Sequence, residues 1–251
     1  KHVMVEKPIT SNADQAQELL NLATERNLVL MVGHTFEYNP AVEAVRNIVQ
    51  SGELGNIYYI YSTRVNLGLL QPDINVMWDL APHDISILRY ILGQDPISIS
   101  ARGAYYVNTY RKLHEVAYVS MSFPDGVLAT VHVSWLDPVK QRRLTIVGSK
   151  KMLVYDDIAD EKVMIFDKGV DVPPYSITEK EFRASYRHGD GTVYSFDWVE
   201  PLRTECNHFL ESIQHETTPR SDGVDGLRVV QALETAQRSL NNGGVELTIE
   251  Y

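Results

Sequence analysis

The segment "WDLAPHDIS", residues 78–86, carries two side chains whose types and spacing could do acid–base chemistry. Asp79 and His83 are four residues apart at the start of a predicted helix, so they can share one face of it. Pro82 has no N–H to offer Asp79 as a helix cap, which leaves the carboxylate free to orient His83 or to accept from a ligand hydroxyl. Histidine suits a general base because its unperturbed pKa lies near neutral pH. The alternative is a helix-starting aspartate beside a structurally satisfied histidine.

Two further candidates follow short apolar runs that are typical of parallel strands. Lys7 comes directly after "HVMVE", where the carboxyl end of a parallel strand opens into the ligand crevice of an α/β sheet. Its ammonium could hold a substrate oxygen and stabilise negative charge on it, although a solvated strand-end lysine would have the same position. His34, Tyr38 and Asn39 follow the second run, near the same crevice. Asn39 is better explained as a helix cap, and His34 fits either role.

The segment "STRVN" ends a longer predicted strand and supplies Arg64. Arg64 is a candidate handle for an anionic group such as a carboxylate or a diphosphate, and the alternative is an ordinary surface salt bridge. A metal site has little support, because the histidines are dispersed and no cluster has ligand spacing. Neither a G-x-S-x-G elbow nor a P-loop motif occurs in the sequence.

The elements that must position these residues begin as a parallel α/β unit. A strand ending at Glu6 is followed by a helix over residues 11–27, with Ser11 as its predicted cap. The apolar strand "LVLMVG" comes next, and Asn39 and Pro40 then open a second helix. Alternation of strand and helix predicts a parallel sheet, of which only two strands are present.

The rest of the chain changes to longer strands. A helix ending at Gly93 precedes several strand-like runs separated by turn signals, a pattern typical of a mainly antiparallel sheet. Residues 169–196 contain two adjacent prolines and no clear period, so we expect a long loop or extension there. Two amphipathic helices, near 199–214 and 222–240, and a last strand close the chain.

The predicted fold class is therefore α/β plus α+β. Residues 1–40 form the remnant of a Rossmann-type parallel sheet, and residues 41–251 form an α/β domain with a large, mainly antiparallel open sheet.

Charge and cysteine usage narrow the partners and the compartment. The chain has 251 residues and a formal net charge of −10, with its Lys and Arg scattered, which argues against nucleic acid as a partner. Cys206 is the only cysteine, so no intramolecular disulfide can form, and we expect it to be buried in a helix. No signal peptide or membrane-spanning apolar run is visible. We therefore predict a cytoplasmic protein with no membrane partner.

Taken in order, these segments resemble the Gfo/Idh/MocA oxidoreductases. "VEKP" resembles the family's Glu-Lys-Pro motif, and "VGHTFEYNPAV" resembles its next strand and crossover helix. "WDLAPHDISILRYILG" resembles the family's Asp-x-x-x-His segment. Its sheet strands and closing helices are matched by "VSWLDP", "LTIVGSKKMLVYDD", "EPLRTECNHFLESI" and "GLRVVQALETAQRS". The resemblance covers nearly the whole chain and implies a dinucleotide-binding domain followed by an α/β domain with an open sheet.

The resemblance also implies an activity, an NAD(P)-dependent transfer of hydride between nicotinamide and a sugar or polyol hydroxyl carbon. Carried over residue by residue, Lys7, Asp79 and His83 match the family's catalytic residues. His83 would take the hydroxyl proton as hydride leaves the same carbon. Lys7 would bind that oxygen, and Asp79 would bind a substrate hydroxyl or orient the histidine.

The cofactor implied by the resemblance is NAD or NADP, and we expect Glu6, Lys7, Pro8 and His34 to lie against it. Members of the family open with a strand, a G-x-G-x-x-G turn and a helix, and this motif is absent from the sequence. We therefore expect either a fragment or a protein without the main pyrophosphate site. Such a chain should bind NAD poorly, because the helix N-terminus that holds the pyrophosphate is absent.

The pattern R-x-N-x-G at residues 64–68 is similar to that of family members in nucleotide-sugar and surface-polysaccharide pathways. A nucleotide sugar oxidised at a ring hydroxyl is thus the first substrate expected, with Arg64 and Asn66 near it. Two other functions stay open. One is a non-catalytic domain that binds a sugar or assembles through its sheet, and the other is an NAD-dependent glycosidase of the same family.

The segment "VLATVHVSW" bears on assembly. It places Val131, Val133 and Trp135 on one alternating face of a strand and polar side chains on the other. Exposed apolar faces of open sheets commonly pair with another subunit. We therefore predict a homodimer or homotetramer that forms through the sheet.

Overall fold

The structure is a computed structural model that describes residues 1–172 and 184–251. Its N-terminal segment forms a two-stranded parallel sheet, β1 (Val3–Glu6) and β2 (Leu30–Gly33), joined by helix α1 (Ala13–Glu25). The predicted parallel pair is confirmed, and because the two strands run in the same direction, both carboxyl ends open at the same edge.

The cap of α1 differs from the prediction. Asn12, not Ser11, caps the helix, its side chain accepting from the backbone N–H of Gln15 at 2.9 Å. Ser11 donates its hydroxyl to the side chain of Gln15 instead. Both residues are good caps, and the choice falls on Asn12 because its backbone is extended, with φ −154° and ψ 160°. Asn27 ends the helix in the left-handed region, at φ 51°.

A short 3₁₀ turn, η1 (Thr35–Tyr38), leads from β2 into helix α2 (Pro40–Gln50). Asn39 caps α2 by accepting from the backbone N–H of Ala41 at 2.9 Å, and Pro40 takes the first helical position, as predicted.

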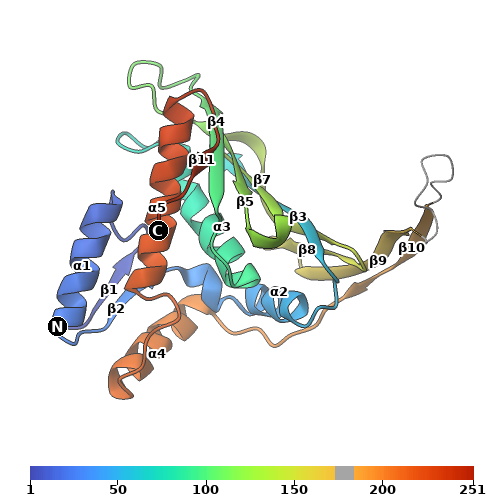
Figure 1. Ribbon diagram of the computed structural model, residues 1–251, viewed down its shortest axis with the longest axis horizontal. Helices are drawn as coiled ribbons and strands as arrows, with labels where there is room; N and C mark the ends of the chain where they lie inside the picture. Colours follow the sequence, from blue (N-terminus) through green and yellow to red (C-terminus); the bar gives the residue numbers. More distant parts are fainter. Residues whose placement is uncertain (173–183) are drawn as a thin grey trace.

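A nine-stranded sheet makes up most of the remaining chain (Figure 1). Its strand order is β10-β9-β8-β7-β3-β6-β5-β4-β11, and every neighbouring pair is antiparallel except β3 with β6. The predicted mainly antiparallel sheet is confirmed. Its strands are β3 (Ile57–Leu67), β4 (Ser98–Ala104), β5 (Val116–Ser122), β6 (Leu128–Ser134), β7 (Leu136–Gly148), β8 (Met152–Asp156), β9 (Val163–Asp171), β10 (Ser185–Val193) and β11 (Leu247–Thr248).

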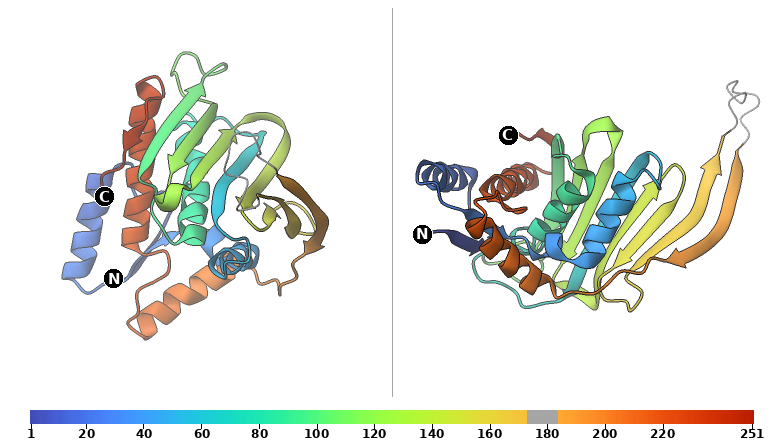
Figure 2. Two further views of the ribbon diagram at one scale, coloured as in Figure 1. Left: turned by 45° about the vertical axis from the view of Figure 1, so that its right-hand side comes forward. Right: turned by 90° about the horizontal axis from the view of Figure 1, so that it is seen from below.

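Helices cover one face of this sheet (Figure 2). They are α2, α3 (Val76–Leu92) and α5 (Gly223–Asn241), and their apolar side chains share one core with the inward residues of the strands. Along β6 the inward residues Ala129, Val131 and Val133 are at most 1% exposed, whereas Leu128 is 55% exposed. The opposite face of the sheet is therefore left open.

This arrangement corrects the basis of the predicted subunit contact. Val131, Val133 and Trp135 lie in the core of this chain under the helices, so they are not available to another subunit. The open face carries a different set of exposed large side chains, Tyr59, Tyr61, Tyr118 and Leu128.

Within residues 169–196, for which the sequence predicted a long loop or extension, residues 169–171 and 185–193 belong to strands. β9 continues to Asp171 and pairs with β10, and the two strands extend away from the helices as a hairpin (Figures 1 and 2). Arg187 binds Asp167 at 2.9 Å and Asp171 at 2.7 Å across the pair. A register shift between His188 and Gly191 breaks the alternation that normally signals a strand. The two adjacent prolines lie at 173–174, within 173–183, outside the described residues.

Helix α3 begins at Val76, three residues before the predicted start. Asn75 caps it by accepting from the backbone N–H of Trp78 at 3.1 Å, so Asp79 and Pro82 both lie inside the helix. The prediction instead placed Asp79 and His83 at the start of the helix.

Helix α4 (Pro201–Gln214) corrects one further prediction, since Cys206 is exposed rather than buried. Its neighbour Glu205 faces inward and is fully buried instead. Consecutive helical residues point about 100° apart, so only one of the two can face the protein. Across the parts of the chain that the structure describes, no helix has both the length and the apolar character needed to cross a bilayer.

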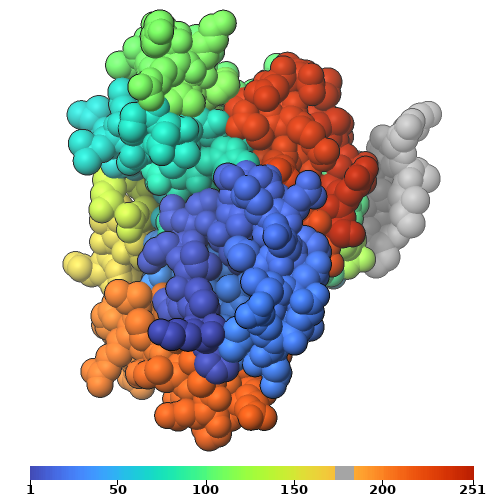
Figure 3. Space-filling view, turned by 90° about the vertical axis from the view of Figure 1, so that its left-hand side faces the viewer, coloured from blue at the N-terminus to red at the C-terminus, as the bar shows by residue number. Residues whose placement is uncertain are grey.

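The N-terminal segment is not isolated from the C-terminal helices. In the space-filling view it lies against α5 and next to α4 (Figure 3). Ile9, Ala16 and Val32 form a second small core with Leu227 and Val230 of α5.

Candidate active site

The end of β1 and the first half of α3 meet, although 72 positions separate Lys7 from Asp79. The Lys7 ammonium donates to the backbone carbonyl of Asp79 at 2.6 Å and lies 3.6 Å from its Oδ1 atom. Pro82 in the next turn has no N–H, so α3 cannot complete its hydrogen-bond ladder here. The carbonyl that loses its partner is that of Trp78, four residues before Pro82, and Lys7 binds the next carbonyl, that of Asp79.

Asp79 is held from two sides. The indole Nε1–H of Trp135 donates to its Oδ2 atom at 3.1 Å, and Lys7 faces its Oδ1 atom. The Asp79 side chain keeps 26% of its exposure, so its carboxylate can still accept from a ligand. No side-chain hydrogen bond joins Asp79 to His83 among the described residues, which favours contact with a ligand over orientation of the histidine.

His83 lies one turn further along α3, with its ring edge-on to Phe36 at a centroid distance of 5.2 Å. Its Nδ1 atom is buried and finds no hydrogen-bond partner among residues 1–172 and 184–251. Burial, then the charges of Arg64 and Lys7, lower the pKa of His83 well below its usual value. Burial likewise lowers the pKa of Lys7. His83 is therefore a neutral imidazole near pH 7, the form that accepts a proton.

A pocket of about 340 Å³ opens directly in front of Asp79 and His83. Arg64 and Asn66 line it beside Asp79 and His83, whereas Lys7 is not among its lining residues and approaches it through its contact with Asp79. The remaining lining residues are Val65, Gly68, Leu69, Gln71, Leu80, Trp135, Lys140, Gln141 and Arg142. A larger cavity of about 460 Å³ lies at the other end of β2, between α1 and α5, and none of the predicted site residues lines it.

Arg64 is buried and paired. Its Nε donates to Asp84 Oδ2 at 2.6 Å, and its guanidinium carbon lies 4.5 Å above the ring of Phe36. Ser62 donates to the other oxygen of Asp84, also at 2.6 Å. The sequence alternatives were a ligand handle and a surface salt bridge, and the structure gives a buried ion pair that still borders the pocket.

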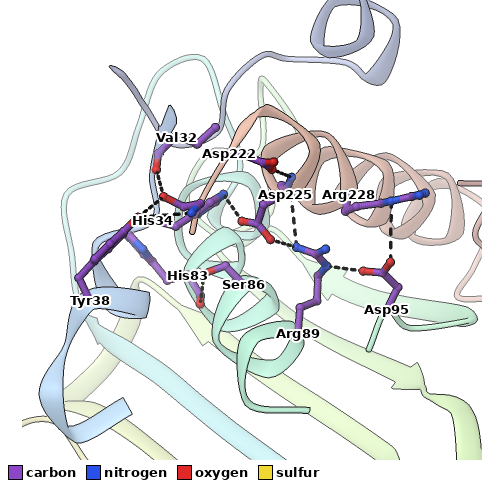
Figure 4. A network of polar contacts seen from close by, with 11 residues as sticks. Val32, His34, Tyr38, His83, Ser86, Arg89, Asp95, Asp222, Asp225 and Arg228 are labelled. Carbon is purple, nitrogen blue, oxygen red and sulfur yellow. Dashed lines mark hydrogen bonds and ion pairs between the residues drawn. The ribbon is translucent and has the colours of Figure 1, made fainter. Parts of the chain in front are cut away.

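His34 belongs to a buried polar network next to His83 (Figure 4). It is fully buried, and its Nε2 atom lies 3.8 Å from Asp225. Asp225 also binds Arg89, which reaches Asp95 at 2.6 Å. Burial lowers the pKa of His34 to about 4, so the ring is neutral. His34 therefore belongs to the buried surroundings of His83. Its predicted contact with a cofactor stays a prediction.

Glu6 and Pro8 flank Lys7 at the edge where β1 ends. Glu6 is exposed, and its carboxylate lies beside Gly33, where an added Cβ would come within 3.3 Å of it. The peptide bond between Lys7 and Pro8 is cis. Glu6, Lys7 and Pro8 thus lie together at one strand end, and their predicted contact with a cofactor stays a prediction.

Several residues of the site were missed at the level of sequence. Trp135 was expected on an apolar face that pairs with another subunit, yet its N–H donates to Asp79. Lys140 and Arg142 line the pocket from β7, and Glu37 is a buried carboxyl group beside Asp225. Arg142 could have been recognised as a site residue only from its position opposite Arg64 on the neighbouring strand. That position follows from the register of β3 and β7, which the sequence alone does not provide. No group of three or more His, Cys, Asp or Glu side chains is arranged to hold a metal ion in the described ranges.

Comparison with known proteins gives two matching family models. The model "Oxidoreductase family, NAD-binding Rossmann fold" matches residues 1–34, and the model of the "GFO/IDH/MocA C-terminal domain" matches residues 42–154.

Individual relatives agree with these matches. An uncharacterised oxidoreductase, YrbE, of Bacillus subtilis is 24% identical over all of this chain and 72% of its own length. UDP-N-acetylglucosamine 3-dehydrogenase of Acidithiobacillus ferrooxidans is 26% identical over 92% of this chain and 68% of its own length. The fold matches that of an inositol dehydrogenase homologue from Azotobacter vinelandii, solved with NADH and myo-inositol, at a TM-score of 0.78 and 17% identity over 98% of this chain and 71% of that one.

The two family matches follow each other in the order of the two sheets. The first covers the parallel pair that ends in Lys7, and the second covers the strands and the helix that carry Arg64, Asp79 and His83. The chain belongs to the Gfo/Idh/MocA family of oxidoreductases.

Proposed function

We propose that this protein transfers hydride between a sugar or polyol hydroxyl carbon and the nicotinamide of NAD, at the site formed by Lys7, Asp79 and His83. One observation carries the proposal. The ammonium of Lys7 is fixed at 2.6 Å from the carbonyl of Asp79, one turn before a neutral His83 that borders a 340 Å³ pocket. A cation, a carboxylate and a base thus meet around a space suited to a small polar ligand.

Each side chain has a distinct part in the proposed reaction. His83 accepts the hydroxyl proton of the substrate, which its lowered pKa permits near pH 7. Lys7 stabilises the negative charge that develops on the same oxygen, and Asp79 accepts a hydrogen bond from a second hydroxyl. The carbon that bears this hydroxyl loses the hydride while its oxygen loses the proton to His83, which gives a carbonyl; NAD, when bound, would supply the acceptor for the hydride.

A nucleotide sugar is our first proposed substrate. Arg64 and Asn66 line the pocket, and a relative at 26% identity is named as a UDP-N-acetylglucosamine 3-dehydrogenase. NAD is the proposed cofactor because the matching family model is described as NAD-binding. In this proposal residues 1–40 belong to the nucleotide-binding part and residues 41–251 form the substrate-binding part.

Location and assembly are part of the same proposal. A cytoplasmic location is supported by the single Cys206, which leaves no intramolecular disulfide to form. A homodimer or homotetramer through the sheet is supported by the exposed aromatic side chains Tyr59, Tyr61 and Tyr118 on its open face.

The test is the replacement of His83 or Lys7 by alanine in the complete protein. Each change should lower turnover by about 10²–10⁴-fold, the usual contribution of a positioned acid–base or charge-stabilising group. NADH binding, followed by its fluorescence, should stay close to that of the unaltered protein. His188, exposed on β10 far from the pocket, serves as the matched control and should tolerate alanine. Full turnover in His83→Ala would refute the assignment of the base.

A further inference from the structure

Arg64 and Arg142 form a partition between two environments. The pocket with Asp79 and His83 lies on one side, and both arginines line it. A small, nearly filled space lined by Asp84 and Asp157 lies on the other side, and the same two arginines border that space as well. Each arginine is bound from the acidic side, Arg64 by Asp84 at 2.6 Å and Arg142 by Asp157 at 3.4 Å.

The guanidinium of Arg64 has hydrogen-bonding capacity left over. The residue is 6% exposed, and its Nε is engaged by Asp84. In the part of the chain that the structure describes, no hydrogen bond engages either Nη atom of Arg64. The Nη atoms are not among the buried polar atoms that lack a partner, so they reach the pocket, where an acceptor on a ligand can replace water.

Lys140 adds a charge that nothing nearby offsets. It is exposed, lines the same pocket from β7, and forms no ion pair with the described residues. The other cations of the site are each balanced by an aspartate: Arg64 by Asp84, Arg142 by Asp157 and Lys7 by Asp79. The pocket therefore keeps one uncompensated positive charge, in a chain whose net charge is −10.

We propose that Arg64, Lys140 and Arg142 form a subsite for one anionic group, a carboxylate or a phosphate, attached to the sugar that is oxidised at His83. The identity of the reacting sugar rests on the proposed function, and the anion subsite itself does not. Arginine suits this role because its planar donors match the paired oxygens of a carboxylate or a phosphate. A volume of about 340 Å³ is at the lower end for ligand pockets, which fits a sugar ring with one charged substituent.

Occupation of the subsite would also act on the base. Four cationic or titratable groups face His83, namely Arg64, Lys7, His34 and Arg142, and with burial they hold its pKa low. An anion bound at the two arginines offsets part of their charge, so the pKa of His83 rises and the imidazole becomes a stronger base. The base is then strengthened only when the correct substrate is present.

The first experiment measures binding without cofactor, by isothermal titration of the full chain. The probes are D-glucuronate, D-glucose 6-phosphate and UDP-glucose, with D-glucose as the neutral comparison. We expect at least one anionic probe to bind about tenfold more tightly than glucose, with an affinity that falls as salt is raised. The probe that binds best identifies the source of the anion as a carboxylate, a phosphate monoester or a diphosphate.

The variants are Lys140→Gln and Arg142→Gln, with Arg143→Gln as the matched control. Arg143 follows Arg142 on β7, so its side chain points to the open face of the sheet. The first two changes should weaken the best anionic probe about tenfold, and the control should change it less than twofold. Lys140 is exposed, so its replacement does not threaten folding. Glucose that binds as tightly as every anionic probe, or equal losses in Arg142→Gln and Arg143→Gln, would overturn the subsite.

The second experiment follows turnover against pH. The acid limb of kcat reports the base with substrate bound, and that of kcat/KM reports the free protein. For an anionic substrate the midpoint of kcat should lie at higher pH than that of kcat/KM. Anion binding with no hydride transfer would refute the proposed function and leave the subsite standing. Turnover of an anionic sugar with an unchanged KM in both Lys140→Gln and Arg142→Gln would refute the subsite and leave the proposed function standing.

Discussion

The Arg64–Asp84 pair offers a sharp test of how the site is held in place. Asp84 directly follows His83 on α3, and Arg64 lies on the neighbouring strand β3, so the pair joins the two elements next to the proposed base. Replacing Arg64 by methionine keeps much of its length and removes its charge. Asp84, 2% exposed, then keeps the hydroxyl of Ser62 as its one close side-chain partner among the described residues.

The expected loss of stability follows from this burial. Removing one partner of a buried ion pair costs about 3–5 kcal/mol, because the other charge stays buried without compensation. For a chain of this size such a loss lowers the midpoint of thermal unfolding by about 6–20 °C. Asp84→Asn should cost less, about 1–3 kcal/mol, since Arg64 can still turn its donors toward water in the pocket.

The assay is urea unfolding, followed in parallel by tryptophan fluorescence and circular dichroism, because coincident curves justify a two-state treatment. Arg143→Met is the control, an exposed arginine on β7 that should change the free energy of unfolding by no more than about 0.5 kcal/mol. The double variant Arg64→Met, Asp84→Asn should lose less than the sum of the single changes, which measures the coupling. A loss in Arg64→Met no larger than that of the control would refute the buried-pair reasoning.

Two further outcomes follow from single contacts. Trp135→Phe keeps an aromatic ring and removes the N–H that donates to Asp79 at 3.1 Å. We therefore expect kcat to fall about 10- to 100-fold, with a smaller change in KM. Unchanged steady-state kinetics would contradict a role for this contact. Burial raises the pKa of Glu205 from 4.5 to about 7, so the folded protein keeps a proton that the unfolded chain has released. The free energy of unfolding should therefore fall as pH rises from about 4.5 to about 7. In Glu205→Gln, unfolding curves recorded across that range should show a weaker dependence on pH. An equally steep dependence in the variant would contradict the raised pKa of Glu205.

Local chemistry explains why much of the fold could be predicted. Asn39 and Pro40 predict where α2 begins, because one is a helix cap and the other suits the first helical position. The apolar runs before Lys7 and Gly33 have the continuous pattern of strands that are covered on both faces. The apolar first half of β9 was expected as a strand, whereas its end and β10 were missed because their polar, glycine-containing residues extend away from the core.

The candidate site shows a similar division. Lys7, Asp79 and His83 are identifiable because each residue type suits a chemical role at a strand end or a helix turn. Trp135 and Arg142 are not, because their roles depend on the register that brings β6, β7 and β3 side by side. Aromatic and basic residues in strands are common, and only distances separate a packing residue from one that holds Asp79.

The site lies where the two hydrophobic cores meet, and this affects how Lys7 is held relative to Asp79 and His83. Lys7 belongs to the strand pair whose small core is completed by α5, whereas Asp79 and His83 belong to the helix that packs on the large sheet. Trp78, directly before Asp79, packs against both cores. A change in either core should therefore shift Lys7 relative to Asp79. The contact between the Lys7 ammonium and the Asp79 carbonyl is then the element that ties the position of the proposed charge-stabilising group to that of the proposed base.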